Sequence, residues 1–297
     1  MLEIDLTSLP SHHSREEILA NPKFSVACNA LVDAMLGLYE HNPFLNRLLL
    51  EAGRNVVFTV LMCLDSAYED DKPETRPTLA LLTKSMQEFG LGSPRRIADL
   101  VSRLLKTGYL EQVLAPSDRR VRILKPTSKM IAQDQDWLVS HYVPLQVMFP
   151  DPGYDPIMQR DPVFQRTHRL VSSKLLPMGA QLLSRNPLML DFMVREAGMM
   201  ILIKLLQLAG PARDTTQEIS YADIGARFGV SRTQVQKLLQ DASEKGLLRL
   251  SKSRGHRVQL TRTLVDAFDG FIADTMQGHD LVYRLTQREC AAGTAAA

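Results

Sequence analysis

The feature that most constrains this chain is a short stretch of sequence that occurs twice, half a chain apart. Residues 42–53 read NPFLNRLLLEAG, and residues 186–198 read NPLMLDFMVREAG. Weaker matches continue on both sides in the same order. The difference in residue number between matched positions changes by only a few residues, and it changes where loops are expected. Two unrelated helical stretches could share one such match, but not an ordered series. We therefore predict a tandem duplication of one domain, with copies at 22–140 and 162–287.

The repeated stretch also has a local interpretation. Asn42 and Asn186 suit helix N-caps, and the proline after each suits the first helical position. Gly53 and Gly198 lie near the end of the stretch, where glycine lowers helix stability relative to alanine. A glycine at the same place in both copies indicates a close approach, which we expect where the two copies pack together.

Short segments lie outside the two copies. We expect an N-terminal arm at 1–21, a linker at 141–161 and a flexible tail at 288–297. The linker is rich in proline, which is typical of a semi-rigid connection. In the arm, Ser14 and Glu17 form a capping-box pattern. The His pair just before it lacks a third ligand, so we interpret it as exposed rather than metal-binding.

Each copy contains the pattern of a helix-turn-helix. The longer helix of each pair carries apolar residues at helical spacing, after a serine N-cap and before a glycine that ends it. A shorter helix precedes it, and the turn between the two contains glycine. The residues that bound these helices are Thr78, Ser93 and Gly108 in the first copy, and Ser220, Ser231 and Gly246 in the second.

Two short strands are predicted after each longer helix. The sequence YLEQVLAPSDRRVRIL begins at Tyr109, and LLRLSKSRGHRVQL begins at Leu247. Apolar residues alternate on both sides of a polar tip, APSDRR in the first hairpin and SKSRGH in the second. A helix-turn-helix followed by a basic hairpin is a winged helix. We therefore predict a mainly α fold with small β wings.

Positive charge is concentrated in these winged segments. Residues 93–130 carry nine Lys or Arg and three acidic residues, and residues 231–262 carry eight and two, so each segment has a net charge of +6. The whole chain has a net charge of only +2, so the remainder is acidic. A solvated helix face does not require this excess at the same point of both copies. We expect these segments to bind double-stranded DNA.

The first copy resembles the MarR family of winged-helix transcription regulators. The residues that carry the resemblance are SPRRIADLVSRLLKTGYLEQVLAPSDRRVRILKPT, from Ser93 to Thr127, with Asp118-Arg119-Arg120 at the place of the family's wing signature. The second copy lacks the wing aspartate and is similar to winged helices in general. The resemblance implies a transcription regulator. Because family members are usually interlocked homodimers, it also implies an intrachain pseudo-dimer, acting either as a monomer or as a homodimer of chains.

The winged-helix arrangement assigns DNA contacts to both copies. Outward residues near the start of each recognition helix are expected to read bases, and cations at helix ends and wings are expected to contact phosphates or the minor groove. In the first copy the predicted interface is Ser93, Arg95, Arg96, Asp99, Arg103, Lys106, Arg119, Arg120 and Arg122. In the second it is Arg232, Thr233, Gln234, Gln236, Lys237, Lys252, Arg254, His256 and Arg257. Because the two recognition helices differ, we expect an asymmetric DNA site.

A small aromatic effector is a further expectation from the resemblance, since relatives bind such ligands between domains. Trp137, Tyr142 and Tyr154 lie near the linker and could line the site. The alternative is that they pack the linker onto the domains. Cys28 lies in a region where some relatives sense oxidants, but the widely spaced cysteines of this chain are more typical of reduced structural thiols.

The sequence also excludes several functions. It lacks the dinucleotide, P-loop, nucleophile-elbow and zinc-protease motifs, so no catalytic residue, metal site or cofactor is expected. It lacks a signal-peptide pattern and a long apolar span, which favours a cytoplasmic protein without membrane contact. Two other functions stay open. Plasmid replication initiators also place two winged helices in one chain, and winged helices also serve as protein-interaction modules.

Overall fold

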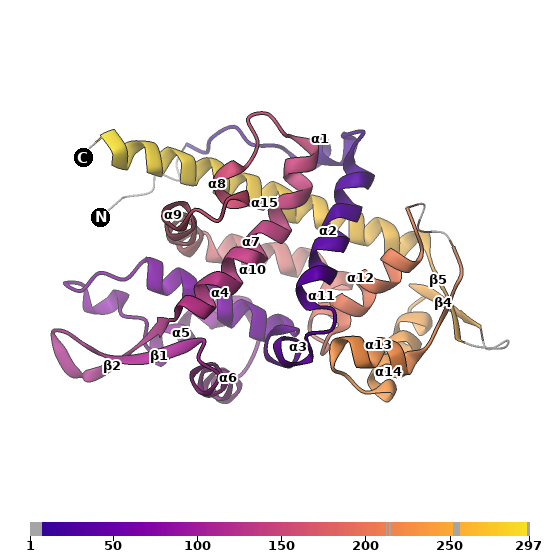
Figure 1. The fold of residues 1–297 in the computed structure, drawn as a ribbon, viewed down its shortest axis with the longest axis horizontal. Coiled ribbons are helices and arrows are strands. Elements are labelled where there is room, and N and C mark those ends of the chain that lie inside the picture. The colour runs from indigo at the N-terminus through magenta and orange to yellow at the C-terminus, as the bar shows by residue number, and fades with distance from the viewer. Residues whose placement is uncertain (1–7, 212, 214, 252–255, 296–297) are drawn as a thin grey trace.

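The computed structural model describes residues 8–211, 213, 215–251 and 256–295 (Figure 1). Within these ranges the protein is mainly helical, with two small antiparallel sheets. The prediction of a mainly α fold with small β hairpins is confirmed at this level.

Each half of the chain contains several helices, then a helix pair, a hairpin and a closing helix. In the N-terminal half, α1 (Arg15–Ala20) precedes α2 (Phe24–Tyr39), α3 (Pro43–Leu49), α4 (Ala52–Ser66), α5 (Leu79–Met86), α6 (Pro94–Lys106), β1 (Leu110–Ala115), β2 (Asp118–Pro126) and α7 (Ser128–Met148). In the C-terminal half, α8 (Asp155–Met158) precedes α9 (Pro162–Lys174), α10 (Leu176–Arg185), α11 (Pro187–Met193), α12 (Gly198–Leu208), β3 (Gln217–Ile219), α13 (Tyr221–Phe228), α14 (Arg232–Glu244), β4 (Leu248–Ser251), β5 (His256–Leu260) and α15 (Arg262–Ala295).

The helix pair of each half begins and ends as the sequence predicts. Ser93 and Ser231 each accept a hydrogen bond from the backbone N–H three residues later, at the start of α6 and α14. Gly108 and Gly246 follow these helices with φ of 75° and 70°, a conformation that strains any residue with a side chain. We refer to α5, α6, β1 and β2 as head 1, and to β3, α13, α14, β4 and β5 as head 2.

The two heads differ in their sheets. In head 2, β3 pairs with β5, which pairs with β4 to give three strands. In head 1 only β1 and β2 pair, and a single hydrogen bond from Leu124 N–H to Pro77 O replaces the third strand. Proline has no N–H to return the second bond of an antiparallel pair, which limits the ladder to that contact. The tip of this hairpin is shorter than predicted, because Arg119 and Arg120 already belong to β2.

The predicted linker and tail are partly helical. Helix α7 continues through residues 141–148 with Pro144 inside it, and α15 continues to Ala295. An internal proline costs a helix about 3 kcal/mol. In α7 the burial of Tyr142, Pro144 and Leu145 outweighs this cost, since they pack into the shared core. Tertiary packing therefore overrides the local signal.

Helices of the two halves cross and cover one another. Helix α2 packs on α7 of its own half and on α12 of the other, and α9 packs on α15 of its own half and on α4 of the other. Helices α7 and α15 also contact each other (Figure 1). As a result, most of the buried apolar side chains form one continuous cluster that includes both halves.

A buried ion pair lies inside this junction. Arg169 of α9 binds Asp134 of α7 through both carboxylate oxygens, at 2.5 and 3.0 Å. The two side chains are 3% and 1% exposed, and Gln165 donates a further hydrogen bond to Asp134 at 2.7 Å. A buried charge is tolerated only when it is paired and hydrogen-bonded, so this contact fixes how α9 lies against α7.

The repeated stretch caps only one of its two helices. Asn42 accepts a hydrogen bond from Leu45 N–H and caps α3, as predicted. Asn186 precedes α11 without capping it, because its amide donates to Leu182 O and to Asp274 of α15.

The two glycines of the repeat make close approaches, but not between the halves as expected. A Cβ atom at Gly53 would lie 3.2 Å from Leu91 O, in the turn between the helices of head 1. A Cβ atom at Gly198 would collide with Phe192 O at the end of α11. Each glycine therefore lets α4 or α12 approach a turn of its own half. The expectation of a contact at the junction of the halves was wrong.

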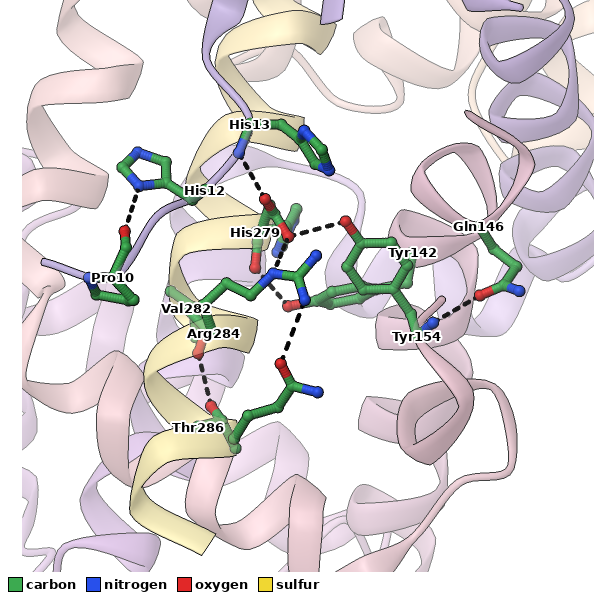
Figure 2. Close-up of polar contacts among 12 residues, drawn as sticks. Pro10, His12, His13, Tyr142, Gln146, Tyr154, His279, Val282, Arg284 and Thr286 are labelled. Carbon is green, nitrogen blue, oxygen red and sulfur yellow. Dashed lines mark hydrogen bonds and ion pairs between the residues drawn. The ribbon is translucent and has the colours of Figure 1, made fainter. Parts of the chain in front are cut away.

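The described part of the N-terminal arm, from residue 8, is held against α15 through His13. Asp280 is fully buried and accepts hydrogen bonds from His13 N–H at 2.7 Å and from the Tyr154 hydroxyl at 2.8 Å (Figure 2). Arg284 forms an ion pair with the same carboxylate at 3.2 Å. The His13 ring stacks on Phe149. The predicted capping box of Ser14 begins α1 directly after this contact.

The buried cysteines are not reactive. Cys28 and Cys63 are buried free thiols, and burial raises the pKa of each thiol to about 12. The thiolate is the nucleophilic form, so both side chains are structural.

Three histidines are kept neutral where the halves meet. Burial lowers the pKa of His141 to about 4, and it holds the pKa values of His168 and His279 well below the ordinary value. The positive charge of Arg169 lowers all three further. Each histidine is therefore uncharged in the folded protein at neutral pH.

The close approach at Gly198 predicts a large effect of a single methyl group. We expect Gly198→Ala to lower the free energy of unfolding by about 1–3 kcal/mol, because the added Cβ must displace backbone. Gly37 is the matched control, since it lies on the exposed face of α2 with open space around it. Gly37→Ala should raise stability by about 0.5–1 kcal/mol. Urea unfolding measures both, and equal stability of the two variants would contradict the assignment.

The neutral histidines predict an acid-labile fold. In the unfolded chain they bind protons near pH 6.5, whereas in the folded protein they do so only at much lower pH. The stability that the neutral histidines contribute to the fold is therefore fully present above pH 6.5 and is lost as pH falls toward 4. We expect the midpoint of thermal unfolding to fall by about 5 °C between pH 7 and 5.5.

The matched variants for this pH profile are His141→Phe and His41→Gln. The first should make the profile shallower by about a third, because His168 and His279 still contribute. The second should leave it unchanged, because the His41 side chain is 70% exposed. A midpoint that does not change over this pH range would rule out neutral buried histidines.

Candidate nucleic-acid interface

The longer helices of both heads reach the same side of the molecule. Figure 1 shows α6 and α14 along the lower edge, with α3 between them and the two hairpins toward opposite sides. Helix α3 contacts α6 of head 1 and α13 of head 2. His41 N–H also donates to Arg227 O at the end of α13. The two heads are therefore held on one face by a shared helix.

Helix α6 presents the predicted residues to solvent. Its apolar face is buried, and Arg95, Arg96 and Asp99 are exposed on the opposite face. Ser93 is occupied as the N-cap, with its hydroxyl 3.4 Å from Arg96 N. At the other end Arg103 and Lys106 are exposed. The DNA-contacting residues predicted on α6 are thus brought together on the exposed side of one helix.

Only some of the α14 residues predicted to contact DNA are exposed without another hydrogen-bond partner. Arg232, Thr233 and Lys237 are exposed, and Gln236 is half-buried. The Gln234 carboxamide accepts from Ser231 N–H at 2.8 Å and donates to Glu196 at 3.3 Å. It therefore completes a capping box with Ser231.

The hairpins place the remaining predicted residues. Arg119, Arg120 and Arg122 are exposed on β2, and Arg122 donates to Gln112 of β1 at 3.3 Å. Arg257 is exposed on β5. His256 is half-buried and stacks on Tyr221 of α13, with ring centroids 3.9 Å apart. The predicted residues Lys252 and Arg254 lie outside the described residues.

Several cations of the two heads have no acidic partner. In the described part of the chain, no carboxylate forms an ion pair with Arg95, Arg96, Lys106, Arg119, Arg232, Lys237 or Arg257. Other cations of the heads are paired, such as Lys125 with Glu111 and Arg227 with Glu40. Unpaired positive charge is therefore present on the exposed faces of α6 and α14 and on the hairpins that follow them.

Sequence reasoning missed two cations beside head 1, Arg47 and Lys129, which lie near the predicted residues Arg103 and Lys106. Arg47 of α3 is exposed, and its guanidinium donates to Gly229 O of head 2 at 3.3 Å. Arg103 donates to Arg47 O at 2.8 Å. Lys129 lies 4.2 Å from the centre of the Tyr109 ring. Arg47, Arg103 and Lys106 line a hollow between α3 and α6. We refer to Arg47, Arg103, Lys106 and Lys129 as the α3–α6 basic cluster.

The matching positions of the other half carry acids. By the offsets of the sequence repeat, Asp191, Asp241 and Glu244 correspond to Arg47, Arg103 and Lys106. Asp191 pairs with Lys245 at 2.6 Å, and Asp241 pairs with Arg195 at 2.6 Å. The sequence indicates Arg47 only through this reversal of charge between the aligned halves. The reversal gains meaning once α3 is known to contact α6.

Two of the three aromatic residues predicted to line an effector site are buried in the core and hydrogen-bonded there. Tyr142 and Tyr154 are fully buried, and the Tyr142 hydroxyl donates to His279 O at 2.7 Å. Both rings pack with Tyr283 of α15. They join α7 and the linker to α15, as the packing interpretation expected. Trp137 is half-buried and stacks on His141.

Comparisons with protein-family models, with curated proteins and with solved structures found no match to this chain. The described residues contain no helix with the length and apolar character needed to cross a membrane. They also contain no group of His, Cys, Asp and Glu side chains arranged to hold a metal ion.

Proposed function

We propose that this protein is a sequence-specific regulator of transcription that binds double-stranded DNA through two winged-helix domains in one chain. The observation that carries the proposal is the unpaired positive charge on heads 1 and 2. It lies on the exposed face of a recognition-type helix and on the following hairpin in both halves. A carboxylate partner would cancel this charge, whereas DNA phosphates would use it.

The proposed roles follow the position of each side chain. Arg95, Arg96, Arg232 and Lys237 lie at the start of α6 and α14, where they reach base edges when the helix enters the major groove. Arg119, Arg120 and Arg257 on the hairpins bind the backbone or minor groove. In this proposal Gln234 fixes the end of α14 instead of reading a base, because its amide is already bonded.

The interlocked halves support a pseudo-dimer within one chain. Each opening helix covers the apolar helix of the other half, an arrangement that otherwise requires two separate subunits. The two recognition helices are unlike in sequence, so the proposed DNA site has two unlike halves. The α3–α6 basic cluster adds phosphate contacts beside head 1 alone, which makes head 1 the stronger anchor.

A plasmid replication initiator is a second candidate, because two tandem helix pairs with hairpins suit that function equally well. Genome-wide mapping of bound sites separates the two. Sites upstream of genes support a regulator, and clustered repeats at one origin support an initiator.

The main test is DNA selection followed by substitution in each head. We expect the protein to enrich an asymmetric sequence from random duplex DNA. Arg95→Ala with Arg96→Ala, and separately Arg232→Ala with Lys237→Ala, should each weaken binding to that sequence by about 10- to 100-fold in a gel-shift assay.

Arg160→Ala is the matched control, since Arg160 is 48% exposed and paired with Asp136 near the linker. It should bind DNA as the unsubstituted protein does. Failure to enrich any sequence, or full binding by both double variants, would refute the proposal and favour a protein-interaction module.

The charge reversal between the halves gives an independent test. Arg47→Ala should weaken DNA binding by about tenfold and reduce the slope of log affinity against log salt by about one. Asp191→Ala removes the matching side chain of α11 and frees Lys245, so affinity should stay equal or rise. Titrations at several salt concentrations measure both. Equal losses for the two variants would show that the α3–α6 basic cluster is not a specific anchor.

A further inference from the structure

A hollow lies between α3 and α6, which Figure 1 shows along the lower edge of the molecule. Its volume is about 510 Å³, within the range of sites that take small organic groups. Helix α3 contributes Phe44 and Arg47 to its wall, and the end of α6 contributes Arg103, Lys106 and Thr107. Both helices belong to the N-terminal half, so one half alone forms this hollow.

An aromatic ring is exposed in the hollow. Phe44 is 54% exposed, although phenylalanine is among the residues that proteins most often bury. Among the described residues no aromatic ring stacks on it, and the Nζ atom of Lys129 lies 5.7 Å from its centre. Exposed apolar area is unfavourable in water. The Phe44 ring is therefore available to a planar partner.

The α3–α6 basic cluster surrounds this ring, and its hydrogen bonds go to carbonyl oxygens. Arg47 donates to Gly229 O at 3.3 Å, and Arg103 donates to Arg47 O at 2.8 Å. Lys129 donates to Thr107 O at 3.0 Å. These bonds fix the side chains and leave their positive charge in place. No acidic side chain lines the hollow, and no carboxylate of the described residues forms an ion pair with the cluster. The hollow consequently favours an anion.

A nucleotide carries both of the groups that this hollow accommodates. Its base has a planar face, and stacking of a base on an aromatic side chain is favourable for every base. Its phosphate is an anion that Arg and Lys side chains bind. In duplex DNA the faces of each base are covered by the neighbouring base pairs. Only an unpaired nucleotide therefore offers the base face and the phosphate together.

Charge and position favour a DNA strand over other anions. A free nucleotide has a single phosphate group, whereas successive phosphates of a strand match several cations. An acidic peptide would satisfy the cations, but its carboxylate side chains have no ring to stack on Phe44. Arg95 and Arg96 begin the same helix whose end carries Arg103 and Lys106. DNA held at head 1 is thus led to the hollow by one helix.

We propose that the hollow binds one unpaired nucleotide of a DNA strand, with the base stacked on Phe44 and the neighbouring phosphates on Arg47, Arg103 and Lys106. The protein then has a second DNA ligand, a single strand, besides the duplex that the recognition helices read. Because the hollow binds only unpaired nucleotides, it shifts DNA beside head 1 toward an opened state. The inference rests on the proposed function only in that head 1 brings the strand to the hollow.

Binding is tested with the purified full chain and no duplex DNA, by fluorescence anisotropy of a labelled oligothymidine. A length of about 12 nucleotides lies within the site sizes of proteins that bind single strands. We expect saturable binding that weakens as salt rises. Phe44→Ala should weaken it by about tenfold, whereas Phe44→Trp should retain it because the ring is kept. Both variants should bind duplex DNA as the unsubstituted protein does.

Val163→Ala is the matched control, since Val163 is 70% exposed on α9 and does not line the hollow. It should leave the binding of single-stranded and duplex DNA unchanged.

Removal of the bases tests the stacking from the side of the ligand. An abasic oligomer of the same length keeps its phosphates, and it should bind the unsubstituted protein about tenfold more weakly than the oligothymidine. Phe44→Ala should bind the two oligomers about equally. Thymidine monophosphate lacks neighbouring phosphates, and polyglutamate lacks bases. Each should compete far more weakly than the unlabelled oligothymidine.

Each outcome decides the proposal. Unchanged single-strand binding by a folded Phe44→Ala variant overturns it, and so does an equal loss of single-strand and duplex binding. Strong competition by polyglutamate or by thymidine monophosphate also overturns it, in favour of an acidic protein partner or a free nucleotide. If circular dichroism shows that Phe44→Ala does not fold, the two oligomers decide with the unsubstituted protein.

A gel-shift assay with duplex DNA separates this inference from the proposed function. Duplex binding without single-strand binding would reject the site at Phe44 and retain the proposed function. Single-strand binding that depends on Phe44, without duplex binding, would retain the site and reject the proposed function.

Discussion

The structure depends on one constraint, which is that neither half alone covers its largely buried helix, α4 or α12. Helix α12 is buried almost throughout from Met200 to Leu206, and α2 of the opposite half supplies one of its main contacts. Helix α4 is covered in the same way by α9. Burial of these two helices stabilises the fold only when both halves are present, because exposed apolar area is unfavourable in water. The linker, the long closing helices and the buried Arg169–Asp134 pair all follow from this crossing.

The two halves differ in their surface charge and in their sheets. The edge beside α3 is basic, whereas the matching positions of the sequence beside α11 carry acids. Head 2 has a third strand, and head 1 has a single backbone bond at Pro77 in its place. Core positions are restrained by packing, so difference between the halves accumulates where side chains meet solvent or a partner.

Local signals predicted a large part of this arrangement. Serine caps, stop glycines and the apolar spacing of α6 and α14 depend on neighbours along the chain, and the sequence displays them directly. Gln234 was predicted to contact DNA, but its side chain is bonded to Ser231 N–H and to Glu196, a partner far away in sequence. The helical part of the linker and Arg47 in the basic cluster could not be predicted, because they arise from contacts between residues far apart in sequence.

The crossing of the opening helices also sets an order of events during synthesis. The chain leaves the ribosome from its N-terminus, so α4 is complete well before Pro162 begins the helix that covers it. Until α9 follows, the apolar face of α4 has no permanent neighbour and is open to chaperones or to self-association. A chain cut off within the linker would remain in that condition. Two separate subunits could exchange partners, whereas here the covering helix always arrives on the same polypeptide.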